Sequence, residues 1–313
     1  MSRIQVVPAG ELEAALAQAL APLGQRRPAS RGRVARFVAQ MRRIGADWHA
    51  IRLTDDAGPR FTAFTLLLPG RAGVLMLGCP DVRTLPDECA QVIAAAQRVA
   101  CERRLHFVQA LIEPGAERVL ALLRQAGFER LTRLIYLERS ISAAPEPRAD
   151  PPGARWLTYS ESRDGLFQAC VRTTYAGSYD CPELSGLRPI SDVLASHKAT
   201  GVFEPGLWEL ATVDETVVGC LLLAPLADGA GLELVYMGVA PEARGRGYGA
   251  WLLRRAFEQC RRHGAARLTL GVDARNSVAL SVYQRSGLEE VASREAYWWR
   301  AGRGRAAHGR PCE

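Results

Sequence analysis

Hydrophobic and polar positions follow clear periodicities along the C-terminal half of the chain. Apolar runs at 207–213, 217–225 and 231–240 predict three strands, and the short polar turns between them favour an antiparallel meander. After residue 249 the apolar side chains recur every three to four positions, which predicts an amphipathic helix. The same periodicities predict the other elements of this half, namely strands at 154–159, 267–273 and 288–299 and helices at 163–177, 190–200 and 277–287. The pattern predicts an α/β fold of the α+β kind, in which helices flank a mixed, mostly antiparallel sheet.

The N-terminal half repeats this order of elements. An offset of 161 residues aligns 107–114 with 268–275, and an offset of 160 residues aligns 124–131 with 284–291. Self-similarity at a nearly fixed offset is typical of an internal duplication. Because the period is that of a whole domain, we expect two copies of one fold in tandem rather than a solenoid.

Breaks in composition suggest where the two copies begin and end. The stretch 140–154 holds four prolines and few large apolar residues, which is typical of a linker. The residues after 300 are rich in Gly, Ala and Arg and show no periodic pattern. We therefore expect domains at 1–140 and 155–300, a linker at 141–154 and a flexible tail at 301–313.

Composition and charge narrow the classes of function. The net charge of +7 is typical of many nucleic-acid-binding proteins, but the basic residues are scattered arginines with Lys198 as the single lysine. We expect no nucleic-acid partner. No apolar run is long enough to span a membrane and the first residues do not resemble a signal peptide, so a cytoplasmic location is expected. The eight cysteines form no C-x-x-C pair and no histidine stands at zinc-ligand spacing, so no metal site is expected.

Three glycines lie within five positions between the third predicted strand of the meander and the following helix: Gly245, Gly247 and Gly249. Consecutive backbone N–H groups at a helix N-terminus form an anion site, and glycines let a bulky anion such as pyrophosphate approach them. The chain lacks the G-x-x-x-x-G-K-[ST] pattern of a P-loop. Gly245, Gly247 and Ala250 fit a G-x-G-x-x-A dinucleotide fingerprint, but they follow an antiparallel meander instead of the first strand of a parallel βαβ unit. A glycine-rich turn without a ligand stays open as the alternative.

Two segments resemble the GNAT superfamily of N-acyltransferases. The stretch R-G-R-G-Y-G at 244–249 is similar to the [QR]-x-x-G-x-[GA] signature of that superfamily. The stretch N-S-V-A-L-S-V-Y-Q-R-S-G-L at 276–288 is similar to its N-x-x-A-x-x-x-Y-x-x-x-G-[FL] segment. The two segments stand in the expected order and on the expected elements, and the resemblance covers roughly 155–300. It implies two tandem GNAT-like domains, of which the second is intact.

The resemblance implies acetyl-CoA as the co-substrate. The loop amides would bind its pyrophosphate, with Arg244 at the entry of the loop, and the strand edge around Met237–Val239 would pair with its pantetheine arm. The residues implied in binding acetyl-CoA are Met237, Gly238, Val239, Arg244, Gly245, Arg246, Gly247, Tyr248, Gly249 and Asn276.

Tyr283 stands where the superfamily carries its tyrosine acid, seven residues after Asn276. By this resemblance its phenol would protonate the leaving thiolate of coenzyme A. A tyrosine that only packs at a helix end is the alternative. Asn276 would hold the pantetheine, cap the following helix, or do both.

Glu233 resembles the strand carboxylate that takes the amine proton in the superfamily, directly or through water. Strict alternation places its side chain on the same face as Val235, Met237 and Val239. Glu209, two strands earlier, is the rival base, and a solvent-exposed strand glutamate is the alternative reading of Glu233.

The first half resembles a degenerate copy of the same domain. With an offset of 161, Gly247 and Gly249 align with Pro86 and Glu88, of which the first lacks an N–H group and the second would repel a phosphate. We expect this half to support the second and to wall its acceptor cleft. The loop at 175–192 should recognise the acceptor, and its acids Asp180 and Glu183 suit a cationic amine.

The resulting hypothesis is an N-acetyltransferase that moves an acetyl group from acetyl-CoA to a small-molecule or peptide amine. A non-catalytic acetyl-CoA-binding sensor or scaffold is the alternative, and turnover on an amine separates the two.

Overall fold

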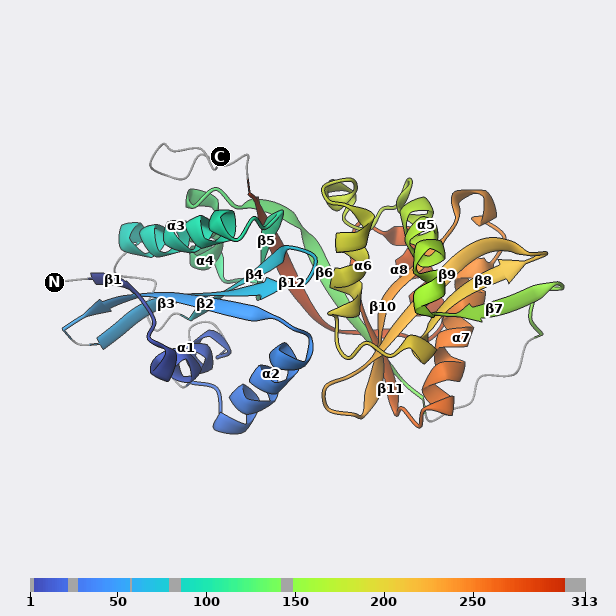
Figure 1. Ribbon diagram of the computed structural model, residues 1–313, viewed down its shortest axis with the longest axis horizontal. Coiled ribbons are helices and arrows are strands. Elements are labelled where there is room, and N and C mark those ends of the chain that lie inside the picture. Colours follow the sequence, from blue (N-terminus) through green and yellow to red (C-terminus); the bar gives the residue numbers. More distant parts are fainter. Residues whose placement is uncertain (1–2, 22–27, 57, 79–85, 142–148, 302–313) are drawn as a thin grey trace. The chain divides into compact units, whose positions relative to one another are not determined.

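The computed structural model describes residues 3–21, 28–56, 58–78, 86–141 and 149–301 (Figure 1). They form two compact units. Unit 1 comprises Met1–Thr132 and Arg294–Glu313, and unit 2 comprises Arg133–Ser293. The expected domain boundaries at 140 and 155 separate the two halves of the sequence. The compact units do not follow these boundaries, because most of the strand at 129–140 belongs to unit 2 and most of the strand at 289–300 belongs to unit 1. Half of the expected linker, residues 142–148, and all but the first residue of the expected tail lie outside the described residues.

Unit 2 is a mixed sheet in the strand order β6-β11-β10-β9-β8-β7. Its strands are β6 (Glu129–Ser140, from Arg133 onward), β7 (Ala154–Thr158), β8 (Trp208–Val213), β9 (Thr216–Pro225), β10 (Gly231–Val239) and β11 (Arg267–Asp273). Its helices are α5 (Asp164–Tyr175), α6 (Ile190–Lys198), α7 (Tyr248–Arg262) and α8 (Ser277–Arg285). Short 3-10 turns lie at Glu161–Arg163, Pro182–Leu184, Pro205–Leu207 and Pro241–Ala243. β10 and β11 are parallel and the other neighbours are antiparallel, so the expected meander of three strands is confirmed.

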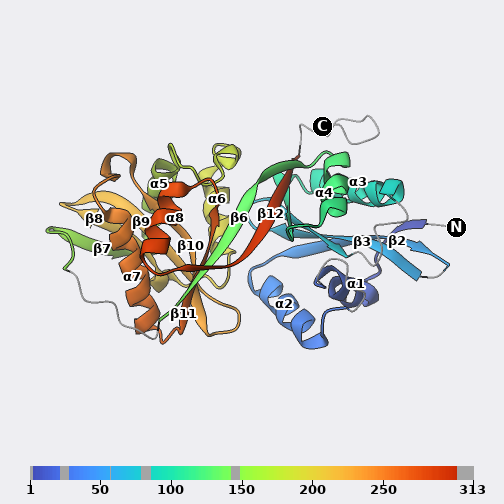
Figure 2. The same cartoon turned by 180° about the vertical axis from the view of Figure 1, so that it is seen from behind.

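Helices cover both faces of the unit 2 sheet because its central strands are apolar on both sides. On one face, α5 and α6 pack against Trp208 and Leu222 (Figure 1). On the other face, α7 and α8 pack against Leu221 and Leu223 (Figure 2). Each face therefore has its own buried core.

Unit 1 repeats this topology in the strand order β1-β2-β3-β4-β5-β12. Its strands are β1 (Arg3–Val6), β2 (Asp47–Asp55), β3 (Gly58–Leu68), β4 (Ala72–Gly78), β5 (Phe107–Ile112) and β12 (Glu289–Arg300, from Arg294 onward). Its helices are α1 (Leu12–Ala19), α2 (Arg31–Arg43), α3 (Pro86–Glu102) and α4 (Glu117–Gln125), with a 3-10 turn at Ala9–Glu11. β4 and β5 are parallel and β12 is antiparallel to β5, just as β10 and β11 of unit 2 are parallel and β6 is antiparallel to β11. The predicted α/β class and the predicted repetition of one fold are confirmed.

The exchanged strands contribute to the core of the unit that they enter. β6 pairs with β11 from Leu134 to Ser140, and Leu137 is only 1% exposed in the core between that sheet and α7. β12 pairs with β5 from Glu295 to Arg300, and the buried hydroxyl end of Tyr297 accepts a hydrogen bond of 2.8 Å from Arg124 Nη2. Neither unit has a complete sheet without residues from the other half of the sequence.

Within the described part of the chain, every helix is too short or too polar to cross a membrane.

Leu137→Ala tests the exchange. Leu131, six residues earlier on the same strand, is also buried but belongs to unit 1, so Leu131→Ala is the matched control. Each truncation should destabilise its own unit by about 2–5 kcal/mol. In hydrogen exchange, Leu137→Ala should loosen the amides of β11 and spare those of β5. Loosening of β5 by Leu137→Ala would contradict the assignment of this strand segment to unit 2.

Candidate active site

Two parallel strands of unit 2 separate in the middle of the sheet. β10 and β11 pair only from Gly231 opposite Arg267 to Leu234 opposite Leu270. Beyond Leu234, β10 continues along β9 alone. The β11 side of β10 from Val235 to Val239 therefore has no strand partner among the described residues, and an extended chain could pair with this open edge.

A β-bulge at Val235 begins where the strands separate. Leu234 lies opposite Leu223, and Tyr236 lies opposite Leu222, so Val235 is the extra residue. Cross-strand partners share a face of the sheet, and an inserted residue shifts the alternation by one position. Glu233 and Tyr236 consequently face α5 and α6.

Met237 and Val239 lie on the opposite face, toward α7, because they are opposite Leu221 and Gly219. The expectation that they share a face with Glu233 is wrong, because strict alternation does not account for the bulge. Gly238 faces α5, and a Cβ on it would lie 2.6 Å from the side chain of Thr174. Gly238 thus allows α5 to pack closely on β10.

The glycine loop lies directly before α7. Gly245 and Gly247 have φ values of 76° and 82°, a left-handed conformation that favours glycine. Gly247 is the N-cap of α7, and among the described residues no atom accepts a hydrogen bond from the backbone N–H groups of residues 245–249. A Cβ on Gly245 or Gly247 would meet nothing within 4 Å, so the space outside the loop is open. These amides and the positive end of a 15-residue helix form an anion site.

The loop side chains have different surroundings. Arg244 donates four hydrogen bonds to backbone carbonyls. Three of these carbonyls belong to the end of α5 and the segment after it, and the fourth is that of Val239. Arg246 is exposed, and its side chain forms no hydrogen bond or ion pair with a described residue. Tyr248 packs against Trp251, with ring centroids 5.9 Å apart.

The two candidate bases differ in their contacts. Burial raises the pKa of Glu233, whose carboxylate accepts no hydrogen bond from any described residue. Glu209 is only 2% exposed and forms a bidentate ion pair with Arg255, at 2.9 Å to Nε and 2.5 Å to Nη2. That pair occupies both oxygens of Glu209, whereas the carboxylate of Glu233 has no such partner among the described residues.

Tyr283 projects from α8 and is 7% exposed. Burial, together with the negative charge of Asp180, raises its pKa, so the phenol is protonated at neutral pH. Its hydroxyl donates to no described residue, which leaves the proton available to a ligand. Asn276 caps α8, and its side-chain oxygen accepts a hydrogen bond of 3.1 Å from the N–H of Ala279.

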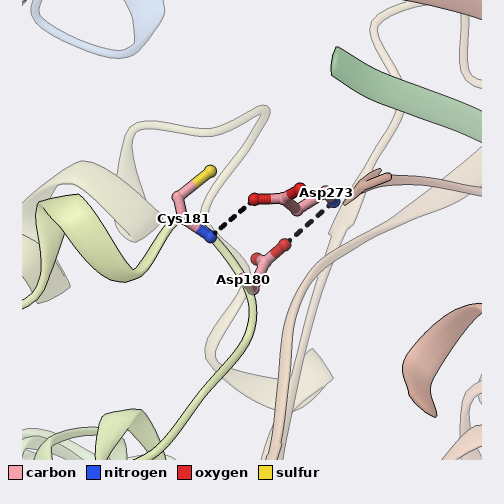
Figure 3. A group of neighbouring side chains, drawn as sticks. All are labelled: Asp180, Cys181 and Asp273. Atoms are coloured by element: carbon pink, nitrogen blue, oxygen red, sulfur yellow. Dashed lines mark hydrogen bonds between the residues drawn. The ribbon is translucent and has the colours of Figure 1, made fainter. Parts of the chain in front are cut away.

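The loop after α5 is fastened to the end of β11 (Figure 3). Asp180 accepts a hydrogen bond from the N–H of Asp273, and Asp273 accepts one from the N–H of Cys181, both at 3.0 Å. Arg275 donates to Asp273 and makes a bidentate pair with Glu183 at 2.6 and 2.9 Å. Glu183 is thereby neutralised, and Asp180 keeps one carboxylate oxygen that accepts from no described residue.

Asp180, Cys181 and Asp273 each offer a ligand atom, and these atoms lie within 4.8 Å of one another. Such a group could hold a metal ion, but Arg275 already compensates the charge of Asp273. Burial and the two carboxylates raise the pKa of the Cys181 thiol, which therefore stays protonated at neutral pH. We interpret the group as the fastening of the loop.

Sequence reasoning missed an aromatic cluster beside the bulge. Tyr175 and His197 share a hydrogen bond of 2.9 Å, and the His197 ring stacks on Tyr236 at 5.2 Å between centroids. Burial lowers the pKa of His197 to about 4, so the ring is neutral at physiological pH. The sequence pattern gave no signal for this cluster, because strict alternation would place Tyr236 on the face opposite Glu233.

An open strand edge that leads to an anion site at a helix N-terminus can hold an extended ligand that carries a phosphate group. Residues 178–288 match the acetyltransferase (GNAT) family, so this region is a GNAT acetyltransferase domain. The mycothiol acetyltransferase of Brachybacterium faecium is 30% identical over 185 residues, which cover 57% of this chain and 55% of that protein. That of Geodermatophilus obscurus is 28% identical over 190 residues, which cover 58% and 59%. The chain thus spans less than two thirds of the length of these relatives.

Solved structures extend the likeness of the fold to both units. A GCN5-related N-acetyltransferase from Sphaerobacter thermophilus has a TM-score of 0.69 at 18% identity and covers 96% of this chain and 95% of its own. A tandem GNAT protein from the clavulanic acid biosynthesis pathway has a TM-score of 0.57 at 14% identity and covers 97% and 100%. The chain is therefore built as a tandem of two GNAT-like units.

Gly247→Ala should weaken acetyl-CoA binding at least tenfold, because a Cβ at a left-handed φ strains the loop by about 1–2 kcal/mol and enters the space in front of the amides. Gly249→Ala is the matched control, because Gly249 has a helical φ and its added Cβ would only touch Val282 at 4.0 Å. Titration calorimetry on both variants checks the expectation. Equal affinities would contradict a close approach of the ligand at Gly247.

Proposed function

We propose that unit 2 is an acetyl-CoA-dependent N-acetyltransferase that moves the acetyl group directly to a primary amine. The observation that carries this proposal is the combination of the open β10 edge with the unpartnered amides of the glycine loop. An extended pantetheine arm and a pyrophosphate need these two features, and the open edge runs to Val239 shortly before the loop.

In this proposal the protein binds acetyl-CoA mainly through its backbone. The N–H groups of Gly245–Gly249 and the dipole of α7 bind the pyrophosphate. The backbone of Met237–Val239 pairs with the pantetheine amides. Arg246 adds a positive charge beside the phosphates, and the side-chain amide of Asn276 still has its N–H donors free for the ligand.

The chemistry requires two proton transfers. The lone pair of the neutral amine attacks the thioester carbonyl, and Glu233 accepts, directly or through water, the proton that the nitrogen loses as the amide forms. An acceptor that arrives as an ammonium ion first releases one proton to solvent. The C–S bond breaks, and Tyr283 donates its proton to the leaving thiolate. Solvent then carries a proton from Glu233 back to Tyr283. The raised pKa of each group suits its role, since Glu233 becomes a stronger base and Tyr283 stays protonated.

Asp180 is the residue proposed to meet a cationic acceptor. It lies on the loop after α5, and one of its oxygens is free of described partners. Glu183 is unsuited to this role because it is paired with Arg275. We also propose one acetyl-CoA site per chain, because α3 of unit 1 begins at Pro86, which has no N–H group. The preceding residues 79–85 lie outside the described residues. They include Arg83, which aligns with Arg244 at the offset of 161.

The experiment that tests the function is a panel of primary amines incubated with acetyl-CoA and read as release of free thiol. The panel should include the amine that the mycothiol acetyltransferases acetylate, because two relatives carry that name. Amine-dependent thiol release supports the enzyme. Tight binding of acetyl-CoA without turnover on any amine supports the alternative of a sensor or scaffold.

Tyr283→Phe should lower kcat by roughly a hundred- to ten-thousand-fold, the usual range for a general acid. The KM for acetyl-CoA should change little, because the proton is donated in the transition state. Steady-state kinetics on the best amine of the panel measure both constants, once chemistry is shown to limit the rate. Full activity in the folded variant would return Tyr283 to a packing role.

Glu233→Gln should lower kcat. In the native chain, the rate should fall at acidic pH as Glu233 is protonated, at a pH above the ordinary pKa of a glutamate. The variant should lack this acidic fall of the pH–rate profile. The variant should also gain stability relative to the native chain as pH rises. A carboxyl group with a raised pKa in the folded state stabilises that state below its unfolded pKa and loses this contribution as pH rises through its folded pKa. Denaturant unfolding of both proteins at several pH values gives the difference. A difference that does not vary with pH would contradict the raised pKa.

A further inference from the structure

Arg244 directs its guanidinium at the protein backbone. Nη2 donates to the carbonyls of Thr174 and Ala176 at 2.9 and 2.8 Å, and Nη1 donates to Gly177 at 3.3 Å. Nε donates to the carbonyl of Val239, the last residue of β10, at 3.2 Å. Four of the five N–H donors of the guanidinium are thereby used within the protein.

Two of the carbonyls that Arg244 contacts, those of Thr174 and Ala176, lie in the last turn and at the C-cap of α5. The last carbonyls of a helix lack intrahelical partners and carry a partial negative charge, which a cation at that end stabilises. Gly177 has a φ of 63°, and a Cβ on it would lie 3.3 Å from Arg244 Nη1. The backbone after α5 therefore fits closely around the guanidinium.

The segment after α5 is held from two sides. Arg244 holds its beginning at residues 174–177, and Asp273 and Arg275 hold Asp180, Cys181 and Glu183. We call residues 174–183 the acceptor strap. Its first residues are hydrogen-bonded to Arg244 of the glycine loop, and its last residues are hydrogen-bonded to the end of β11 and the connection from β11 to α8.

We propose that Arg244 is a positioning residue that transmits acetyl-CoA binding to the acceptor strap and does not itself ligate the pyrophosphate. This inference rests on the proposed function. Arg244 directly precedes Gly245, so an anion that orders the loop amides also fixes the backbone from which the guanidinium extends. The ordered guanidinium then fixes the carbonyls of the strap that carries Asp180. Arg246, whose side chain is exposed and forms no hydrogen bond or ion pair with a described residue, is the arginine of this loop that is free to meet phosphate.

The test compares Arg244→Met with Arg246→Met in the full chain. Both variants remove one positive charge from the same loop, but only the first removes bonds to the strap. Amide hydrogen exchange is followed at residues 174–183 without ligand and with saturating coenzyme A. In the native chain and in Arg246→Met, coenzyme A should slow exchange in the strap. In Arg244→Met, the strap should exchange at least tenfold faster before ligand is added and should no longer respond to coenzyme A.

Kinetics provide a second readout. Arg244→Met should raise the KM for the amine more than the KM for acetyl-CoA, and Arg246→Met should do the reverse. Arg244→Lys keeps the charge with fewer donors and should fall between the native chain and Arg244→Met. Unchanged amide hydrogen exchange in β9 shows that a variant is folded. If Arg244→Met is not folded, Arg244→Lys takes its place in both experiments.

Three outcomes would overturn the proposal. If Arg244→Met weakens coenzyme A binding but leaves exchange in the strap unchanged, Arg244 is a phosphate ligand. If the two methionine variants behave alike, only their charge matters. If the native chain binds no coenzyme A, the proposed function fails, and so does the proposal that Arg244 transmits coenzyme A binding. Amide hydrogen exchange of the ligand-free variants then still decides whether Arg244 holds the acceptor strap.

Discussion

One inserted residue in β10 controls the geometry of the site. Val235 has no partner on β9, and from that point β10 no longer pairs with β11. A strand inside a sheet normally has both of its edges hydrogen-bonded, so the separation exposes backbone groups that require a partner. The bulge also rotates the following side chains, which brings Tyr236 beside His197 and turns Met237 toward α7. The open edge and the arrangement of side chains around it thus have one origin.

Charged residues around this opening act mostly on the backbone and on one another. Asp273 accepts from the backbone of the acceptor strap, Arg275 neutralises Glu183, and Arg255 neutralises Glu209. Pairing of this kind leaves few charged groups uncompensated. Glu233, Tyr283, Arg246 and one oxygen of Asp180 are among the groups of the site without a partner in the described residues, and a group must be free in this way to act on a ligand.

Much of the fold could be predicted from the sequence because strands and helices have different hydrophobic periods. The repeat at 107–114 and 268–275 indicated two copies of one unit, and the left-handed glycines at 245 and 247 are where a loop around an anion needs them. The exchange of β6 and β12 could not be predicted, because a strand pattern identifies a strand and not its partner. The bulge at Val235 is invisible for a related reason, since an extra apolar residue in an apolar run does not change the pattern. The pair of Glu209 with Arg255 joins residues 46 positions apart, and only the fold brings them together.

The exchanged strands also impose an order on synthesis. The unit 2 share of β6 and all of β7 to β11 have been made once residue 273 has left the ribosome, because β6 comes from the first half of the chain. Unit 1 is translated first, yet its β5 edge stays unpaired until residues 294–300 emerge. For that interval the nascent chain exposes a strand edge of the kind that can pair with other chains. The half that is made first is therefore the half that is completed last.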